Sequence, residues 1–301
     1  MEVLLQQIIN GLVLGSMYAL VALGYTMVYG IIGLINFAHG DVLMVGALTS
    51  WTVIGWMMDA STGMPTWLVL LLATIIAMVV CAALNFSIEK LAYRPLRNSN
   101  RLAPLITAIG MSLLLQTFAM IIWAPNPKSY PSMLSREPIA LGGAVISVTQ
   151  VVILATTAIT LAFLMWLVNR TNLGRAMRAT AENPRVAALM GVRPDMVISA
   201  TFIIGAALAA VAGVMWAANY GTVQHSMGFL PGLKAFTAAV LGGIGSLPGA
   251  MLGGLLIGLI ESFWAAYLWA EYKDVATFGI LCLVLMLRPS GLLGRPEVEK
   301  V

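Results

Sequence analysis

This chain has unusually few charged residues. Only 9% of its 301 residues are Asp, Glu, Lys or Arg, whereas a soluble domain carries about 25%. So few charged side chains cannot cover the surface of a soluble globule. Intrinsic disorder is excluded too, because disordered segments have low hydrophobicity and this chain is 60% apolar. The composition predicts an all-α, polytopic integral membrane protein with one transmembrane domain over residues 1–301.

Catalytic and metal-binding motifs are missing as well. No G-x-x-x-x-G-K-[ST] sequence occurs, so the chain cannot hydrolyse ATP through a P-loop. Gly-x-Ser-x-Gly and His-Glu-x-x-His are absent, and two histidines leave little for base catalysis. We expect no enzyme, no catalytic residue, no metal and no cofactor bound by this chain. Cys81 and Cys282 lie in apolar runs and are expected to be small buried hydrophobic residues.

Long apolar runs are what the chain does have. A helix that spans a membrane needs about 20 mostly apolar residues. The candidate runs are 4–30, 38–58, 66–88, 102–123, 146–168, 197–218, 232–247, 248–269 and 274–288. The seventh and the last are short, and the seventh could enter the membrane and return, so we expect eight or nine spans. The first run follows no basic residue, and we therefore expect it to be retained rather than cleaved as a signal peptide.

Basic residues are unevenly distributed among the loops. Twelve of the 16 lie in the segments 90–101, 170–193 and 288–300, and the other four are Lys128, Arg136, Lys234 and Lys273. Lys and Arg collect in cytoplasmic loops, which explains the net charge of +4 without a nucleic-acid partner. We expect a cytoplasmic C-terminus and, with nine spans, an outside N-terminus. An inside N-terminus would require that the chain near 30–40 or 242–249 does not cross fully.

Two segments interrupt the apolar runs, at 30–41 and 241–249. Their unusual residues are Asn36, His39, Asp41, Gly242, Gly243 and Gly245. Broken backbone at membrane depth occurs where it is buried in protein or lines a wet cavity, and in secondary transporters such pairs of interruptions point to the binding site. Either these residues belong to a translocation pathway or gate, or both segments are tight turns whose small residues allow close packing.

The roles of three polar side chains in or beside the spans also have more than one interpretation. A charge such as Glu261 costs about 2.5–3.5 kcal/mol at a helix centre, so it lines the pathway, pairs with another helix, or lies near a helix end. Gly258 precedes it by one turn on a small-residue face that should point into the bundle. Its candidate partners by type are Lys234 and His39. Asp41 could instead cap the following helix, and His39 is either a pH switch or a hydrogen-bonded structural group.

The loop 169–196 is rich in Ala and Arg and favours short helices. Pro184 divides it, Asn183 or Glu182 stands where a second helix would begin, and Gly191 ends that helix. The segment 187–190 gives an apolar face. A short amphipathic helix parallel to the membrane suits a soluble partner, or it rests on anionic lipid.

Several short motifs are informative about the family of the chain when they are taken together. They are Gly24-Tyr-Thr-Met-Val-Tyr-Gly30, Asn36-Phe-Ala-His-Gly40, Tyr93-Arg-Pro95, Gly174-Arg175 with Ala181-Glu182, the segment 234–246, and the tail 294–301. In this order and at these depths they resemble the membrane permease of a branched-chain amino-acid ABC importer, the shorter H-type of its two permeases. The resemblance covers essentially the whole chain.

The resemblance implies a complex and a substrate class. It implies a pore shared with a second permease, two cytoplasmic ATPase subunits that hold ATP and magnesium, and a periplasmic protein that delivers substrate, all at the bacterial inner membrane. It implies coupling to the ATPase through Arg178, Ala181, Glu182, Asn183, Pro184, Ala187 and Gly191. The tail and the lysine-bearing Gly-rich segment favour leucine, isoleucine and valine; urea, short amides or another small polar solute remain alternatives, as does an ion-coupled secondary transporter.

Overall fold

The computed structural model describes residues 2–33, 35–60, 63–97, 99–100, 102–135, 137–141 and 143–294. Four of the 16 basic residues lie outside the described residues: Arg101, Arg136, Arg295 and Lys300. The part 295–301 of the tail motif also lies outside them. Helices dominate the described chain, and the predicted all-α class is confirmed.

Nine apolar helices form the bundle in the described residues. They are α1 (Glu2–Ile32), α2 (His39–Asp59), α3 (Thr66–Ile88), α4 (Leu102–Trp123), α5 (Val148–Arg170), α8 (Pro194–Tyr220), α9 (Phe229–Gly242), α10 (Leu247–Tyr267) and α11 (Lys273–Leu287). Seven of the described helices are long and apolar enough to cross a membrane, and α9 and α11 are shorter. Each of the nine overlaps one predicted span, so the chain is a multi-pass membrane protein.

Short elements connect these helices. A π-helix (Glu89–Tyr93) and a 3-10 helix (Arg94–Leu96) extend α3, and a second 3-10 helix (Ala270–Tyr272) precedes α11. The loop 169–196 contains α6 (Asn172–Glu182) and α7 (Pro184–Leu189). The strands are β1 (Lys128–Ser129), β2 (Pro138–Leu141), β3 (Ala144–Ser147) and β4 (Thr222–Val223), with β1 antiparallel to β4 and β2 antiparallel to β3.

Two sequence predictions need correction. The span predicted at 232–247 is α9, which begins at Phe229 and ends at Gly242, because Gly243 has φ 105° and cannot continue a helix. Cys81 is buried as expected, but Cys282 is exposed on α11. A side chain on the outer face of a membrane helix can be apolar without being covered by protein, and hydropathy alone does not distinguish the two positions.

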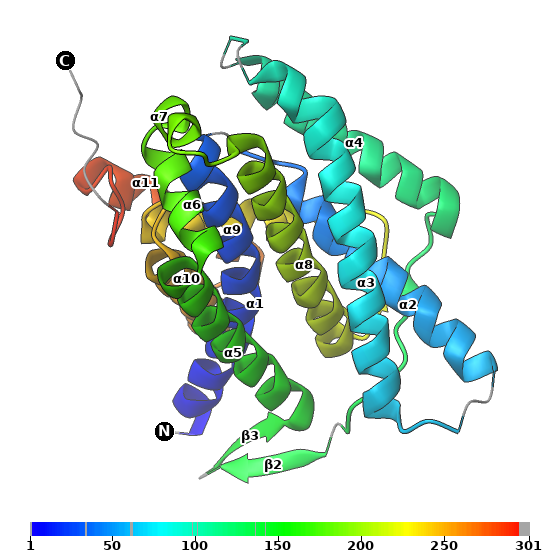
Figure 1. The fold of residues 1–301 in the computed structure, drawn as a ribbon. Helices are drawn as coiled ribbons and strands as arrows, with labels where there is room; N and C mark the ends of the chain where they lie inside the picture. The colour runs from blue at the N-terminus through cyan, green and yellow to red at the C-terminus, as the bar shows by residue number, and fades with distance from the viewer. Residues whose placement is uncertain are drawn as a thin grey trace.

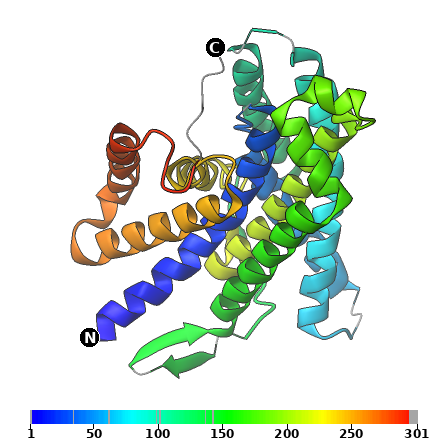
Figure 2. The same ribbon diagram turned by 60° about the vertical axis from the view of Figure 1, so that its left-hand side comes forward.

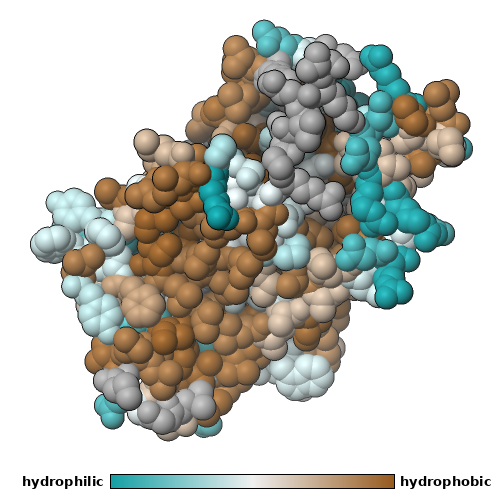
Figure 3. Space-filling model, turned by 90° about the vertical axis from the view of Figure 1, so that its left-hand side faces the viewer, coloured by the Kyte–Doolittle hydropathy of each residue, from teal (hydrophilic) through white to brown (hydrophobic). Residues whose placement is uncertain are grey.

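α1 and α8 lie at the centre of the bundle. α1 packs against α10, α8 and α9, and α8 also packs against α2 and α3 (Figures 1 and 2). The outer helices α3, α4 and α5 expose many apolar side chains, among them Val79, Ile121 and Ile159. The flank that carries α10 and α11 shows a broad hydrophobic surface, with hydrophilic residues gathered at the upper right of the view (Figure 3). Such a surface is suited to contact with lipid or with another membrane subunit.

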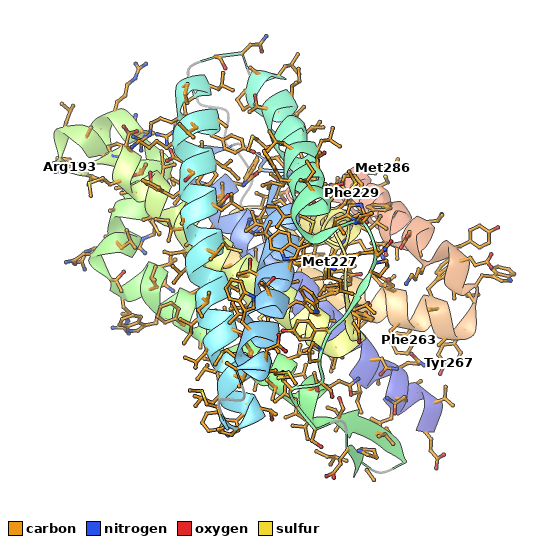
Figure 4. The ribbon with its side chains drawn as sticks, turned by 90° about the vertical axis from the view of Figure 1, so that its right-hand side faces the viewer. Arg193, Met227, Phe229, Phe263, Tyr267 and Met286 are labelled. Atoms are coloured by element: carbon orange, nitrogen blue, oxygen red, sulfur yellow. The ribbon has the colours of Figure 1, made fainter. Side chains whose placement is uncertain are left out.

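The two ends of the bundle differ. The N-terminus and the β2–β3 hairpin lie at one end, where Gln6 exchanges two hydrogen bonds with the backbone of Val145 (2.8 and 3.0 Å), and α6 and α7 lie at the other (Figure 1). Arg193 lies toward the α7 end, whereas Phe263 and Tyr267 lie toward the opposite end (Figure 4). The described part of the basic loops 90–101 and 170–193 therefore meets at one end, where Arg97 binds Asp195 at 2.6 Å.

Candidate functional site

The first interrupted segment joins α1 to α2 inside the bundle. Asn36 and His39 are at most 3% exposed, but they contact different neighbours. Tyr93 donates a hydrogen bond of 2.7 Å to Oδ1 of Asn36. The His39 ring packs edge-on against Tyr25, with ring centres 4.8 Å apart, and occupies the space that a Cβ on Gly24 would need. The segment is therefore held by two separate contacts rather than by one polar cluster.

Asp41 joins two helices and does not cap α2. It is 1% exposed, and its carboxylate accepts hydrogen bonds from Ser112 (2.5 Å) and Gln116 (3.0 Å) of α4. The N-cap residue of α2 is Ala38, and no side-chain capping bond is made there. The capping interpretation of Asp41 is therefore wrong, although a carboxylate in the first turn still suits the helix dipole.

The second interruption is a glycine turn between α9 and α10. Gly243 and Gly245 have φ angles of 105° and 90°, a region that glycine adopts without steric cost. Ser246 is the N-cap of α10 and accepts a hydrogen bond from the backbone of Gly249 (3.2 Å). Gly242 packs so closely on Gly249 that a Cβ at either position would meet the other backbone. Both the turn and the packing therefore depend on glycine.

The segment after α11 closes this turn. The backbone N–H groups of Leu292 and Leu293 donate hydrogen bonds of 2.9 Å to the carbonyls of Leu241 and Gly242. Gly291 lies against Gly243, where a Cβ would come within 2.6 Å of the backbone nitrogen. The segment that follows α11 therefore holds the C-terminal end of α9. The role of Gly242, Gly243 and Gly245 in a pathway or gate stays a prediction.

Glu261 lies in a network of charges in which Glu261 and Lys234 are buried and Lys273 and Asp274 are partly exposed. Lys234 of α9 binds Oε1 of Glu261 at 2.8 Å, Lys273 of α11 binds the same oxygen at 3.2 Å, and Tyr18 of α1 donates a hydrogen bond of 2.9 Å to Oε2. Asp274 also binds Lys234, at 2.6 Å. The two carboxylates and two ammonium groups balance, so the cluster is formally neutral. It joins four helices, and of the two candidate partners by type, Lys234 is the one that binds Glu261.

The predicted small-residue face of α10 does point into the bundle. Gly258 meets the backbone of Gly15 and Gly11 of α1, and a Cβ on Gly254 would lie 2.6 Å from the backbone of Ala19. Glu261 is 3% exposed on this side of the helix. Its other suggested partner, His39, packs against α1 residues instead. The carboxylate is therefore a partner in an interhelical network, while its place in a pathway stays a prediction.

A third buried carboxylate, Glu89, was not predicted from the sequence. Glu89 has no exposed surface, and it accepts hydrogen bonds from Arg97 and from Ser199 (2.7 Å), with Arg94 at 3.5 Å. It links the end of α3 to α8, and Arg97 continues to Asp195. The sequence did contain a pattern that indicates this pairing. A single carboxylate ends an apolar run and is followed by two arginines, which suggests an ion pair rather than a solvated loop.

The predicted helices of the loop 169–196 are present. Thr171 caps α6, accepting a hydrogen bond from the backbone of Gly174 (3.1 Å). Asn183 caps α7 by accepting from the backbone of Arg185 and Val186, with Pro184 as the first helical residue. Gly191, with φ 85°, follows the end of α7. Asn183, rather than Glu182, is therefore the residue that begins the second helix.

The apolar face of α7 differs from the predicted one. Ala187 is 3% exposed and turned toward the protein, whereas Val186, Leu189 and Met190 are 53%, 86% and 82% exposed. In a helix of one and a half turns the two faces alternate within a few residues, so the run 187–190 cannot lie on one face. Arg178, Ala181 and Glu182 of α6 are exposed. The surface open to a partner is therefore carried by Leu189 and Met190 and not by Ala187.

A cavity of about 500 Å³ brings two predicted sites together. It lies between α1, α5, α6 and the glycine turn, and its lining includes Arg178, Ala181, Glu182 and Gly245. Asn36, His39, Asp41 and Glu261 are not among the residues that line it. The cavity therefore joins the loop 169–196 to the second interruption and to the beginning of the first, where Gly30 and Ile31 line it, but it does not reach Asn36, His39 or Asp41.

No group of three or more His, Cys, Asp or Glu side chains suited to a metal ion occurs in the described residues. The acidic side chains of the described interior are instead paired with Lys, Arg, Ser or Gln, as above.

Comparison with known proteins gives a consistent result over nearly the full length. A family model described as branched-chain amino acid transport system / permease component matches residues 7–286. The chain is 50% identical to the high-affinity branched-chain amino acid transport system permease protein BraD of Pseudomonas aeruginosa, over 99% of this chain and 98% of the relative. It is 49% identical to the corresponding protein LivH of Escherichia coli K12, over 99% and 97%.

A shorter similarity extends to another transporter. The autoinducer 2 import system permease protein LsrC of Escherichia coli is 35% identical over 108 residues, which is 36% of this chain and 31% of LsrC. No solved structure matches the chain.

Proposed function

Because the chain belongs to the family of branched-chain amino acid transport system permease components, we propose that it forms half of a membrane pathway for leucine, isoleucine and valine. The observation that carries the proposal is identity of about half the residues, over nearly full length, to permease proteins of high-affinity branched-chain amino acid transport. The chain supplies the transmembrane part and is not an enzyme.

The proposed complex contains a second homologous permease, two ATPase subunits with ATP and magnesium, and a periplasmic substrate-binding protein, with membrane lipid around the helices. The absence of a P-loop sequence supports ATP hydrolysis by separate subunits. The exposed Leu189 and Met190 at one end of the bundle support docking of such a subunit there, because exposed apolar clusters mark interaction sites.

We place the α6–α7 end in the cytoplasm of a bacterium, with the protein in the inner membrane and the C-terminus inside. The meeting of the described basic loops at this end supports the orientation, because Lys and Arg favour the cytoplasmic side. Lys128 lies near the opposite end, in β1, which pairs with β4 beyond α8.

The orientation can be tested with single cysteines. In a variant in which Cys81 and Cys282 are alanine, Arg178→Cys should resist a membrane-impermeant maleimide in intact spheroplasts, and Ser132→Cys should react. Both positions are exposed in the structure, so differences in labelling report sidedness. Permeabilised cells are the control, in which both should react. Labelling of Arg178→Cys from outside would reverse the topology.

Transport can be tested by reconstitution. Uptake of radiolabelled L-leucine should require this chain, the second permease, the ATPases, the binding protein and ATP together, and unlabelled isoleucine and valine should compete. Urea and acetamide should not compete. Uptake by this chain alone, driven by a sodium or proton gradient, would instead establish the secondary-transporter alternative.

Docking of the ATPase can be tested on α7. Leu189→Glu is expected to weaken ATPase binding about tenfold or more, because a charge would replace an apolar contact at the centre of the interface. Co-purification of the ATPase and stimulated ATP hydrolysis are the measurements. Met196→Glu places the same charge at an exposed apolar position outside α6 and α7 and is expected to be mild. Full ATPase binding by Leu189→Glu would leave lipid as the partner of α7.

A further inference from the structure

The cavity beside α6 contains an unusual polar atom. Thr26 of α1 lines it and is 2% exposed, and its Oγ1 has no hydrogen-bond partner among the described residues. Buried hydroxyls in proteins are nearly always hydrogen-bonded, and an exception calls for an explanation such as a bound molecule. Thr26 therefore places a buried polar atom without a partner in the wall of the cavity.

The wall around Thr26 is apolar and adaptable. Met27, Met165 and Met177 come from α1, α5 and α6, and Val168 and Leu247 complete the apolar lining. Methionine side chains are unbranched and fill spaces of irregular shape. Such a wall accommodates aliphatic groups that differ in branching. The cavity volume also lies in the range of about 300–1,000 Å³ that is typical of small-molecule sites.

Two opposite charges stand at the α6 side of the cavity. Arg178 and Glu182 both line it, and they lie four residues apart, on one face of the helix. Arg178 donates one hydrogen bond to the carbonyl of Val168, which leaves other N–H groups of its guanidinium available. Glu182 makes no ion pair within the described chain. A guanidinium and a carboxylate at this spacing are complementary to a zwitterion.

We propose that this cavity binds the zwitterion of an aliphatic α-amino acid from the side of the membrane on which α6 and α7 lie. Arg178 binds the α-carboxylate, Glu182 binds the α-ammonium group, and the aliphatic side chain lies among the methionines, near Thr26. The inference rests on the proposed function and deepens it: the ligand is the transported product, drawn from the cytoplasmic pool.

Occupancy has a consequence for transport. The cavity separates α6 from the glycine turn before α10, and Gly245 has open space on the side where a Cβ would lie. An amino acid in this space prevents α6 from approaching the turn. Because α6 belongs to the loop that we propose to couple to the ATPase, a bound product restrains the coupling movement. High internal leucine should therefore slow the importer.

The test uses photoleucine, a leucine analogue with a diazirine in its side chain, on the complete importer in sealed membrane vesicles. In inside-out vesicles, ultraviolet light should attach the probe to peptides of α1, α5 or α6. Excess L-leucine should prevent the labelling, whereas isocaproate, which lacks the ammonium group, and isoamylamine, which lacks the carboxylate, should not. Right-side-out vesicles with the probe outside should show no labelling of these peptides.

Two variants make the test specific. Met165→Trp fills the cavity and should remove the labelling. Glu182→Gln removes the charge that binds the α-ammonium group and should weaken competition by L-leucine about tenfold, as expected for one weakened hydrogen bond to a charged group. Co-purification of the subunits shows that each variant assembles. A wild-type complex that is not labelled on these helices, or that is labelled equally in both variants, would overturn the proposal.

The failure of this inference and of the proposed function can be told apart. Leucine uptake by the same wild-type importer, measured without internal leucine, tests the function alone. Uptake without labelling disproves only the cavity site, and specific labelling without uptake disproves only the transport function.

Discussion

Glu261→Leu is expected to destabilise the assembled permease by about 3–5 kcal/mol, because it removes one partner from the buried Glu261–Lys234 ion pair. Lys234, 5% exposed, would keep Asp274 but lose the carboxylate at 2.8 Å, and Lys273 would lose its bond to the same oxygen. Glu261→Gln retains an oxygen for these donors and should be less harmful. The thermal midpoint of the detergent-solubilised complex and leucine uptake are the measurements.

Two companion variants separate charge balance from loss of packing. Glu271→Leu removes an exposed glutamate in the short helix before α11 and should leave the midpoint unchanged. Lys234→Met added to Glu261→Leu should restore part of the stability, because replacing both members of a buried ion pair by apolar groups is often neutral. If Glu261→Leu alone assembles and transports normally, the network contributes nothing and Glu261 is no longer a site candidate.

Gly258→Leu should also destabilise the permease, and through packing alone. A Cβ at Gly258 would meet the backbone of Gly15 and the carbonyl oxygen of Gly11, and backbone cannot move aside as a flexible side chain can. Overpacking costs about 1–3 kcal/mol, occasionally more, and here it would separate α10 from the central helix α1. The yield of folded complex after solubilisation, followed by size-exclusion chromatography, should fall accordingly.

Gly110→Leu is the matched control. Gly110 lies in the middle of α4, and a Cβ there would have no atom within 4 Å. The same substitution should therefore be neutral or slightly favourable, since leucine also has the better helix propensity. Equal yields for Gly258→Leu and Gly110→Leu would show that the close approach of α1 and α10 is not required.

The helices were predictable because each depends on a local property. An apolar run of sufficient length, ended by Gly, Pro or polar residues, suffices to place a membrane helix to within a few residues. The sequence also reduced the partners of Glu261 to two candidates, Lys234 and His39, since an intramembrane charge has few possible partners, but only the structure selects Lys234. Lys273 and Asp274 were not connected with Glu261, because they looked like the polar end of a neighbouring helix.

The features that the sequence could not predict are contacts between helices. Asp41 looked like a cap because its sequence neighbours suit one, and only the position of α4 shows that Ser112 and Gln116 reach it. Ala187 and Leu189 are both apolar, yet one faces the protein and the other faces outward. The unpartnered hydroxyl of Thr26 is visible only when α5 and α6 are in place around it.

The bonds from Leu292 and Leu293 to the end of α9 set an order on biosynthesis. The last carbonyls of a helix have no partner within it, and here those of Leu241 and Gly242 are satisfied by residues made about fifty positions later. A ribosome must finish nearly the whole chain before α9 can be closed. A chain that ends before residue 292 would leave two carbonyls of this 14-residue helix without these partners.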